Sequence, residues 1–231
     1  MHELILNFFN LAIYKSVTPI LLQGLAMTVL LSVLIIPLGL FFGLVLSIVY
    51  LHVTNRIVKA LLILYIDVFR AIPPLVLLIL VYFGLPFLNI EITNLTAVIL
   101  CFVLNNSCYY GEVFRSGLIS VPKGQAEAAR STGLSFLQSL LYVQIPQATR
   151  NVMPDLISNS LEIVKLTTIA SAVALPEVLH MAQNAQSLLY NPSPIVLAGI
   201  FFLILLVPVV RLISHMERRR LAGHRSSSRL I

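Results

Sequence analysis

The sequence predicts an all-α protein that crosses a membrane five times. Of its 231 residues, 58% are hydrophobic and only 10% are charged, and the mean hydropathy is +0.96. A soluble domain carries about 25% charged residues, so this chain cannot cover a water-facing surface. Five apolar stretches have the roughly 20 residues that a helix needs to cross a hydrocarbon core about 30 Å thick. These observations exclude a soluble enzyme.

The predicted spans lie within a single transmembrane domain of residues 25–215, and they cover residues 25–51, 60–83, 94–115, 152–175 and 195–214. Residues 1–24 lack the basic region and cleavage pattern of a secretory signal, so we expect them to remain and to lie along the outer interface. Charges and prolines interrupt two of these spans. The second span contains Asp67, Arg70, Pro73 and Pro74, and the fourth contains Asp155, Glu162 and Lys165.

The positive charges fall on one side of the predicted membrane. Twelve of the 15 Lys and Arg residues lie at the end of spans one, three and five or after them. Cytoplasmic segments are enriched in these residues, so the N-terminus is expected outside and the C-terminus in the cytoplasm. The basic tail, residues 216–231, directly follows a span and has no interleaved aromatic residues. This pattern favours orientation and contact with membrane lipid over nucleic-acid binding.

The cysteines and histidines form no recognisable site. Cys101 and Cys108 are seven residues apart, about 10 Å along a helix, which is too far for a disulfide. The five histidines form no cluster with metal-ligand spacing. We expect both cysteines to be inert packing residues and the chain to hold no metal.

The one sizeable predicted cytoplasmic loop, residues 117–150, has the pattern helix, turn, helix. Residues 124–130 favour a helix, Gly133 can adopt the positive φ that ends it, and residues 136–143 form a second helical stretch. Pro146 disfavours a helical conformation for the residue before it, so the second helix is expected to end there. Such a projection is either a docking site for a soluble partner or an amphipathic segment on the membrane surface.

This loop resembles the EAA motif of binding-protein-dependent ABC importer permeases, through Glu127-Ala128-Ala129, Gly133, Ile145 and Pro146. Its flanks are similar to the polar amino acid permease family, which includes histidine, glutamine and opine uptake systems. The resemblance covers about residues 18–215 and implies the five-helix type I importer permease fold of the bacterial plasma (inner) membrane. The flanks that carry it are Gln23-Gly24, Thr28, Phe69-Arg70-Ala71-Ile72-Pro73, Tyr110 to Gly117, Lys123-Gly124-Gln125 and Lys165-Leu166-Thr167-Thr168.

The resemblance implies a division of labour among several subunits. The chain would form the pathway with a second permease, either a copy of itself or a sister chain, and an external solute-binding protein would deliver the amino acid substrate. A dimer of ATP-binding subunits would dock on the loop. The chain has no G-x-x-x-x-G-K-[ST] phosphate loop, so we expect it to bind no cofactor and to leave ATP hydrolysis to that partner. The expected coupling residues are Gly124, Gln125, Glu127, Ala128, Ala129, Gly133 and Pro146.

Span four carries charges that are candidates for the substrate pathway. Asp155, Asn159 and Glu162 share one helical stripe, and Lys165 lies one turn from Glu162. An ionisable group at mid-membrane costs about 2.5–3.5 kcal/mol and implies a partner or a wet cavity. Glu162 and Lys165 either line the path of a zwitterion or neutralise each other. In the family the corresponding residues are usually Lys-Asp-Thr-Ser, and Leu166 stands here in place of the Asp. If that acid holds a cationic side chain in relatives, this subunit lacks the contact unless Glu162 substitutes for it.

Span three carries a second polar stripe. Asn105, Tyr109 and Glu112 recur at helical spacing and run toward the predicted cytoplasmic mouth. Their amide, phenol and carboxylate groups can hydrogen-bond a zwitterion, although buried polar residues also join helices in membranes. We take them as pathway candidates with that alternative open.

Span two carries the predicted gating residues. Pro73 and Pro74 free backbone carbonyls and suit a bend that moves between two open states. Arg70 is expected to satisfy those carbonyls or to pair with Asp67, and direct substrate binding is the less favoured alternative.

Two other functions remain as alternatives to an amino acid importer permease. A permease for osmolytes or other small polar solutes would share the loop. A membrane-embedded enzyme would need a nucleophile with a base or paired metal ligands at one depth. The chain has no G-x-S-x-G and no histidine near Asp155 or Glu162 in sequence, which disfavours the enzyme.

Overall fold

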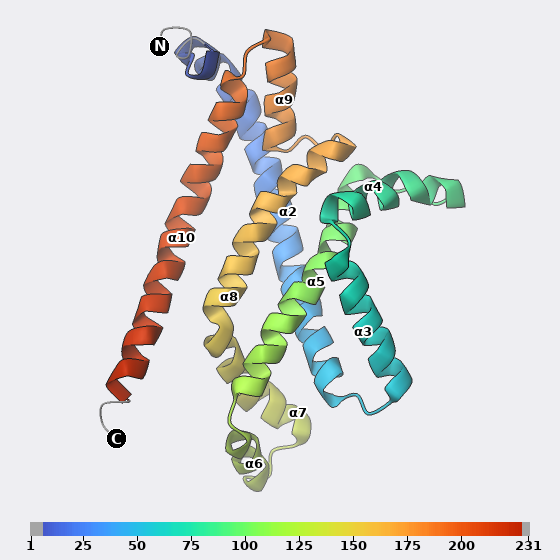
Figure 1. The fold of residues 1–231 in the computed structure, drawn as a ribbon, viewed down its shortest axis with the longest axis vertical. Coiled ribbons are helices and arrows are strands. Elements are labelled where there is room, and N and C mark those ends of the chain that lie inside the picture. The colour runs from blue at the N-terminus through green and yellow to red at the C-terminus, as the bar shows by residue number, and fades with distance from the viewer. Residues whose placement is uncertain (1–6, 228–231) are drawn as a thin grey trace. The chain divides into compact units, whose positions relative to one another are not determined.

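The structure, a computed structural model, describes residues 7–227, which form helices and connecting turns with no strand. Over this range the predicted all-α class is confirmed. In chain order (Figure 1) the elements are α2 (Leu11–His52), α3 (Arg56–Ala71), α4 (Pro74–Gly84), η1 (Leu85–Leu88), α5 (Asn94–Ser120), α6 (Lys123–Ser131), α7 (Phe136–Ser139), η2 (Leu140–Gln144), α8 (Ile145–Leu166), η3 (Thr167–Val173), α9 (Val178–Leu189) and α10 (Ser193–Ser227).

Among the described residues, four helices are long and apolar enough to cross a membrane, and a bent pair makes up to five. The four are α2, α5, the stretch from α7 through η3, and α10 as far as His215. The pair consists of α3 with α4 and η1, which a break at Ile72 and Pro73 separates. The chain therefore has the several apolar spans that the sequence predicts. Which end of each span faces the cytoplasm stays a prediction.

α2 and α10 extend well beyond their predicted spans. α2 begins at Leu11 and runs for 42 residues, about 63 Å, which is more than one crossing requires. Asn10 caps it, because its side-chain oxygen accepts hydrogen bonds from the N–H groups of Ala12 and Ile13. The helix continues through Pro19 without a break. α10 continues to Ser227, into the predicted tail 216–231, whose side chains lie outside the described part.

The helix does not end at Pro146 as the sequence predicts. α7, η2 and α8 follow one another without a break. η2 is a π turn, in which the Ile145 N–H donates to the Leu140 carbonyl five residues back. In an α-helix the proline ring collides with the carbonyl four residues before it. The wider π turn directly before Pro146 relieves this crowding, so the chain continues into α8.

The chain divides into two compact units. Unit 1 comprises the described parts of residues 1–36, 73–102 and 160–231, and unit 2 comprises residues 37–72 and 103–159. Unit 1 therefore holds the first part of α2, α4, the start of α5, the end of α8, α9 and α10. Unit 2 holds the rest of α2, α3, most of α5, the loop helices α6 and α7, and most of α8.

The core of unit 1 lies where α2, α9 and α10 pack together (Figure 1). Its buried residues are Val17 and Leu21 of α2, Val178, Ala182 and Ala185 of α9, and Leu197 and Ala198 of α10. Gly24 allows a close approach, because a Cβ there would lie 2.8 Å from the Val178 Cα. The buried Thr28 accepts a hydrogen bond from the Val178 N–H (3.3 Å). These contacts hold the start of α9 against α2.

A buried acid begins α9. Glu177 is 0% exposed, and its carboxylate accepts hydrogen bonds from the N–H groups of Leu179 (2.8 Å) and His180 (2.6 Å). It is the N-cap of the helix, between η3 and α9 and outside the candidate spans. Burial raises the pKa of Glu177 to about 7, although the two backbone donors favour the carboxylate and oppose the shift. No local pattern in the sequence marks this residue.

Unit 2 is built on close contacts between α2 and α5. A Cβ at Gly43 would lie 2.5 Å from the Tyr110 Cβ and 2.9 Å from the Gly111 nitrogen, so only glycine fits there. Tyr110 is fully buried. A second cluster joins the end of α5 to η2 and α8, and its buried members are Leu118, Val121, Leu140 and Ala148.

Cys101 and Cys108 are both free and fully buried in α5. The Cys101 thiol lies 3.9 Å from the Leu77 carbonyl, and the Cys108 thiol lies 3.5 Å from the Leu104 carbonyl of its own helix. Both side chains pack in the interior, in keeping with the role expected from the sequence.

The raised pKa of Glu177 predicts that stability falls as the pH rises from about 4.5 to about 7. Over that range the Glu177 carboxyl group is protonated in the folded state and ionised in the unfolded state. The free energy of unfolding therefore decreases by at most about 3 kcal/mol, and this group adds no further change above that range. Glu177→Gln imitates the protonated acid, so its thermal midpoint should exceed that of the wild type by a margin that grows with pH. Far-UV circular dichroism in detergent measures both midpoints, and a constant margin would contradict the shift.

Candidate functional site

The break after α3 leaves backbone carbonyls without their usual helical partners. Pro73 and Pro74 have no N–H, so the carbonyls of Phe69 and Arg70 lose the donors four residues ahead. Asn105 on α5 replaces one donor, because its Nδ2 donates to the Phe69 carbonyl at 2.5 Å. Asn105 is 1% exposed. The bond therefore lies in an interior where water is not available to satisfy the carbonyl.

A second contact holds α3 against α5 one turn earlier. The Tyr65 hydroxyl lies within hydrogen-bond distance of the Leu104 carbonyl (3.1 Å) and the Ser107 hydroxyl (2.8 Å). The Tyr65 ring also packs against Phe69, with ring centroids 4.8 Å apart. Together with the Asn105 bond, these contacts fix the C-terminal end of α3 on α5.

Arg70 is exposed at this fixed end of α3. Its guanidinium lies over the Tyr109 ring of α5, with Cζ 5.5 Å from the ring centroid, which is a cation–π contact. The structural roles expected for Arg70 are not found in the described residues. It forms no ion pair with Asp67, and the freed Phe69 carbonyl bonds Asn105 instead. The α3–α5 contact thus gathers several predicted site residues.

Glu112 is paired within its own helix. Arg115 Nη2 donates to one carboxylate oxygen at 2.6 Å, and its Nε lies 3.2 Å from both oxygens. The Arg115 guanidinium also lies 5.8 Å from the Tyr50 ring centroid. The charge of Glu112 is compensated on α5, and its role in the pathway stays a prediction.

The predicted residues of α8 differ in how they are satisfied. Glu162 and Lys165 form an ion pair, with side chains 60% and 52% exposed. Mutual neutralisation is therefore present, and lining of the path stays a separate prediction. Asp155 is exposed and forms no ion pair with any described residue. The Asn159 Nδ2 is buried without a hydrogen-bond partner among the described residues, which is unusual and leaves a spare donor on α8.

The loop helices α6 and α7 form a hairpin at one end of unit 2 (Figure 1). Gly133 has a φ of 89° between them, and the Leu134 N–H donates to the Ala129 carbonyl, which ends α6. Ser135 begins α7 with a capping box, in which its side chain and that of Gln138 each bond the other's backbone N–H. The turn is therefore defined by its own hydrogen bonds.

Most of the predicted coupling residues lie on the outside of this hairpin. Ala129 is buried, whereas the other six are exposed: Gly124, Gln125, Glu127, Ala128, Gly133 and Pro146. Large apolar side chains are exposed beside them, namely Phe136, Leu137, Leu141 and Tyr142. We call these ten exposed residues the loop surface.

A cavity of about 450 Å³ lies beside the loop surface. Its lining mixes apolar side chains of α2 and α5, such as Leu51 and Leu118, with Lys123 and Glu127 of α6. His52 also lines it and packs edge to face against Phe136, with centroids 4.9 Å apart. The cavity therefore connects the end of α2 with the predicted coupling residue Glu127.

Sequence reasoning did not select Tyr65 and Ser107, although both hold the site together. Tyr65 precedes Phe69 by one turn, so it lies on the side of α3 whose carbonyl Pro73 leaves free. That spacing was the available signal for Tyr65. The two-residue step from Asn105 to Ser107 gives none, because residues two apart on a helix do not face the same side.

Comparisons with known proteins identify similar sequences over most of the chain. The family described as "Binding-protein-dependent transport system inner membrane component" matches residues 35–222. A probable amino-acid ABC transporter permease protein of Bacillus subtilis is 34% identical over 180 residues, which cover 76% of this chain and 77% of that protein. A probable glutamine ABC transporter permease protein of the same organism is 35% identical over 167 residues, covering 71% and 76% respectively.

A solved structure is similar in both sequence and fold. It is described as the crystal structure of an amino acid ABC transporter with histidines, and the TM-score is 0.79 at 31% sequence identity. The match covers 90% of this chain and 97% of that chain. The similarity therefore extends over nearly the whole of both.

Asn105→Ala is expected to lower the free energy of unfolding by about 1–3 kcal/mol, because the Phe69 carbonyl stays buried without its donor. Asn105→Asp should be no better, since a carboxylate has nearly the same size but no N–H. Asn151→Ala is the control, because Asn151 makes an exposed side-chain bond to Ser120 and costs little when removed. Unfolding of the detergent-solubilised protein by SDS, followed by circular dichroism, measures the difference. Equal midpoints for Asn105→Ala and the control would count against the bond.

Proposed function

The chain belongs to the family of binding-protein-dependent transport system inner membrane components, and we propose that it is the permease subunit of an ATP-driven importer for polar amino acids. The observation that carries the proposal is the family match over residues 35–222, which includes part of α2 and all the later candidate spans. As a family member with four to five apolar helices in the part of the chain that the structure describes, it is a multi-pass protein of the inner membrane.

The names of similar proteins support the substrate class. The two Bacillus subtilis relatives are named as amino-acid and glutamine ABC transporter permeases, and the similar solved structure is an amino acid ABC transporter. A permease for osmolytes would share the family, but none of these three proteins is named for such a substrate. All three are transport proteins, which makes a membrane-embedded enzyme the weaker alternative.

The loop surface is the proposed docking site for a dimer of ATP-binding subunits. Its exposed apolar side chains are of the kind that mark protein interaction sites. The cavity beside Glu127 offers a recess next to it for a partner's side chain. The Gly133 turn and the capping box of α7 fix the conformation of the loop before a partner binds. This reduces the conformational entropy that is lost on binding.

The remaining subunits are proposed from the family and from the residues of the chain. Because the sequence has no phosphate loop, ATP is bound by the partner and this chain binds no cofactor. A second permease, either a copy or a sister chain, completes the pathway, and an external solute-binding protein delivers the amino acid. The proposed pathway residues are Asn105, Tyr109, Glu112, Asn159, Glu162 and Lys165.

Uptake by the reconstituted complex tests the substrate class. The permease, isolated from membranes with its ATP-binding partner and placed in proteoliposomes, should accumulate a radiolabelled polar amino acid when ATP and the solute-binding protein are supplied. Excess unlabelled glutamine, arginine or histidine is expected to inhibit this uptake, and the osmolyte glycine betaine is not. Transport of betaine with no inhibition by any amino acid would reject the amino acid class.

Gly124→Leu is expected to prevent docking of the ATP-binding subunits without disturbing the permease. Gly124 is exposed on α6, and apart from its chain neighbours and the backbone of its own helix no described atom lies within 4 Å of the position of its Cβ, so the chain itself has room for the larger side chain. A partner packed on this surface does not.

Gly84→Leu is the matched control, because its Cβ position is equally open and lies at the end of α4, outside the loop. Co-purification of the ATP-binding subunit with tagged permease measures docking. The subunit should be lost from Gly124→Leu and retained by Gly84→Leu at equal permease yield, and its retention by both would reject the docking site.

A further inference from the structure

One acid–base pair in the candidate spans stays open. Three of these helices carry an acid three residues before a base: Asp67 and Arg70 in α3, Glu112 and Arg115 in α5, and Glu162 and Lys165 in α8. The α5 and α8 pairs close into ion pairs. Within residues 7–215 no ion pair joins Asp67 to Arg70, although both side chains are exposed and the spacing is the same.

The contacts of α3 explain why this pair is open. The Arg70 guanidinium lies on the Tyr109 ring instead of on an acid. The Asp67 side chain is also one methylene shorter than the glutamates of the closed pairs, so it reaches less far along the helix. Asn105 and Tyr65 hold the end of α3 on α5, so the position of Arg70 does not depend on an ion pair.

Three polar groups at this point have unused hydrogen-bonding capacity. The Asp67 carboxylate, the Arg70 guanidinium and the Tyr109 hydroxyl make no hydrogen bond to any other described residue. Arg70 lies about 21 Å along the helix from Arg56, within a hydrocarbon core about 30 Å thick if α3 enters the membrane at Arg56. Unpaired charges at that depth are costly unless a partner or a wet cavity receives them.

We propose that Asp67, Arg70 and Tyr109 bind the zwitterionic head group of a free α-amino acid. The planar guanidinium of Arg70 donates two N–H groups to the carboxylate, the Tyr109 hydroxyl donates a third hydrogen bond, and the Asp67 carboxylate accepts from the ammonium group. Residues three apart on a helix have Cβ atoms about 5–6 Å apart, which leaves space for the head group between the two charges.

This proposal rests on the amino acid importer proposed above and names the residues that would recognise the part common to all its substrates. A phospholipid head group that carries a phosphate and an ammonium group offers the same two charges to exposed side chains, so it is the alternative source of this chemistry. A third possibility is that Arg70 only packs on Tyr109 and binds nothing.

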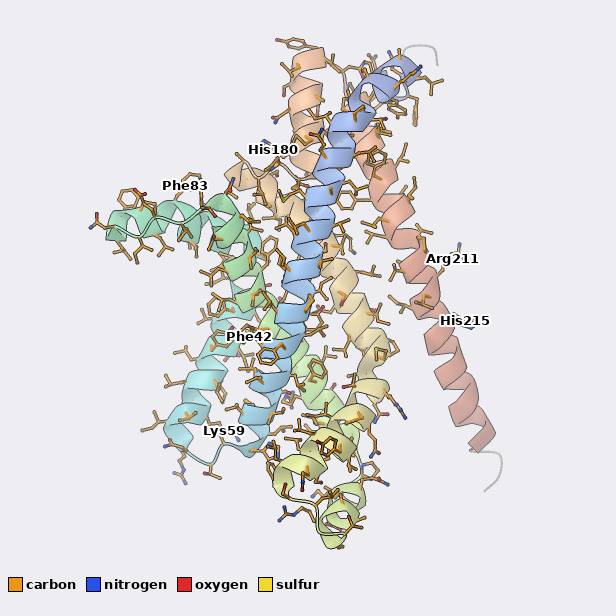
Figure 2. The ribbon with its side chains drawn as sticks, turned by 180° about the vertical axis from the view of Figure 1, so that it is seen from behind. Phe42, Lys59, Phe83, His180, Arg211 and His215 are labelled. Carbon is orange, nitrogen blue, oxygen red and sulfur yellow. The ribbon has the colours of Figure 1, made fainter. Side chains whose placement is uncertain are left out.

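The experiment measures equilibrium binding of radiolabelled L-glutamine, L-arginine and L-histidine to the complete permease–ATPase complex in phosphatidylcholine nanodiscs. The solute-binding protein is left out, so that only the permease selects the ligand. Asp67→Asn and Arg70→Gln are each expected to weaken binding about tenfold, and Tyr109→Phe about threefold. Lys59→Gln is the matched control and should bind as the wild type does. Lys59 lies near the start of the same helix (Figure 2), with its ammonium 5.5 Å from the Tyr50 ring centroid.

Competition by analogues separates recognition from a loss of structure. The decarboxylated amine of the bound amino acid should compete relatively better in Arg70→Gln than in the wild type, because that variant no longer reads the carboxylate. The deaminated acid should compete relatively better in Asp67→Asn for the corresponding reason. A damaged fold would weaken all ligands alike. Unchanged discrimination in both variants overturns the proposal, whatever their affinity.

Three more outcomes overturn it and identify what failed. If the variants bind the amino acids normally but lose phosphatidylethanolamine that co-purifies with the wild type, the site belongs to a lipid. If the wild-type complex transports an amino acid and the variants bind it as well as the wild type does, the proposed binding site is rejected and the proposed importer function is retained. If the wild-type complex neither binds nor transports any of the three amino acids, the proposed function itself fails.

Discussion

Much of unit 2 depends on the requirement that a backbone carbonyl in an apolar environment receives a hydrogen bond from the protein. Pro73 and Pro74 remove two donors at the end of α3, and the Asn105 amide supplies one of them from α5. That bond ties the helices together next to Arg70. The guanidinium is then held at the Tyr109 ring. A missing N–H therefore determines the geometry of the candidate site.

The charges of the spans are stabilised in two different ways. Glu112 and Glu162 each have a base one turn away, so the net charge is neutralised within a single helix. When such pairs are exposed, they neutralise each other's charge but add little to the free energy of folding. Arg70 is held by a contact between two helices and has no compensating acid among the described residues. Packing alone does not account for keeping an uncompensated cation there, because an apolar residue would avoid the cost of burying its charge in the membrane.

Features encoded in short stretches of sequence could be predicted, and those that depend on distant residues could not. Hydrophobic runs predict the spans, and Gly133 adopts positive φ at the turn between the loop helices. The carbonyls freed by Pro73 were also predictable. The donor was not, because Asn105 lies 36 residues from Phe69 in the sequence. The π turn that carries the helix through Pro146 was not predicted either, and its first residue, Leu140, packs against Leu118 and Val121 at the end of α5.

The two buried cysteines have a practical consequence. Cys101 and Cys108 are the only thiols of the chain, and both are inaccessible in the folded protein. A membrane-impermeant maleimide therefore has no native target. A cysteine introduced at an exposed position becomes the single reactive site, because the unmodified chain does not react with the reagent. The sidedness of every loop can be mapped in intact cells, one position at a time, without removing a residue from the core.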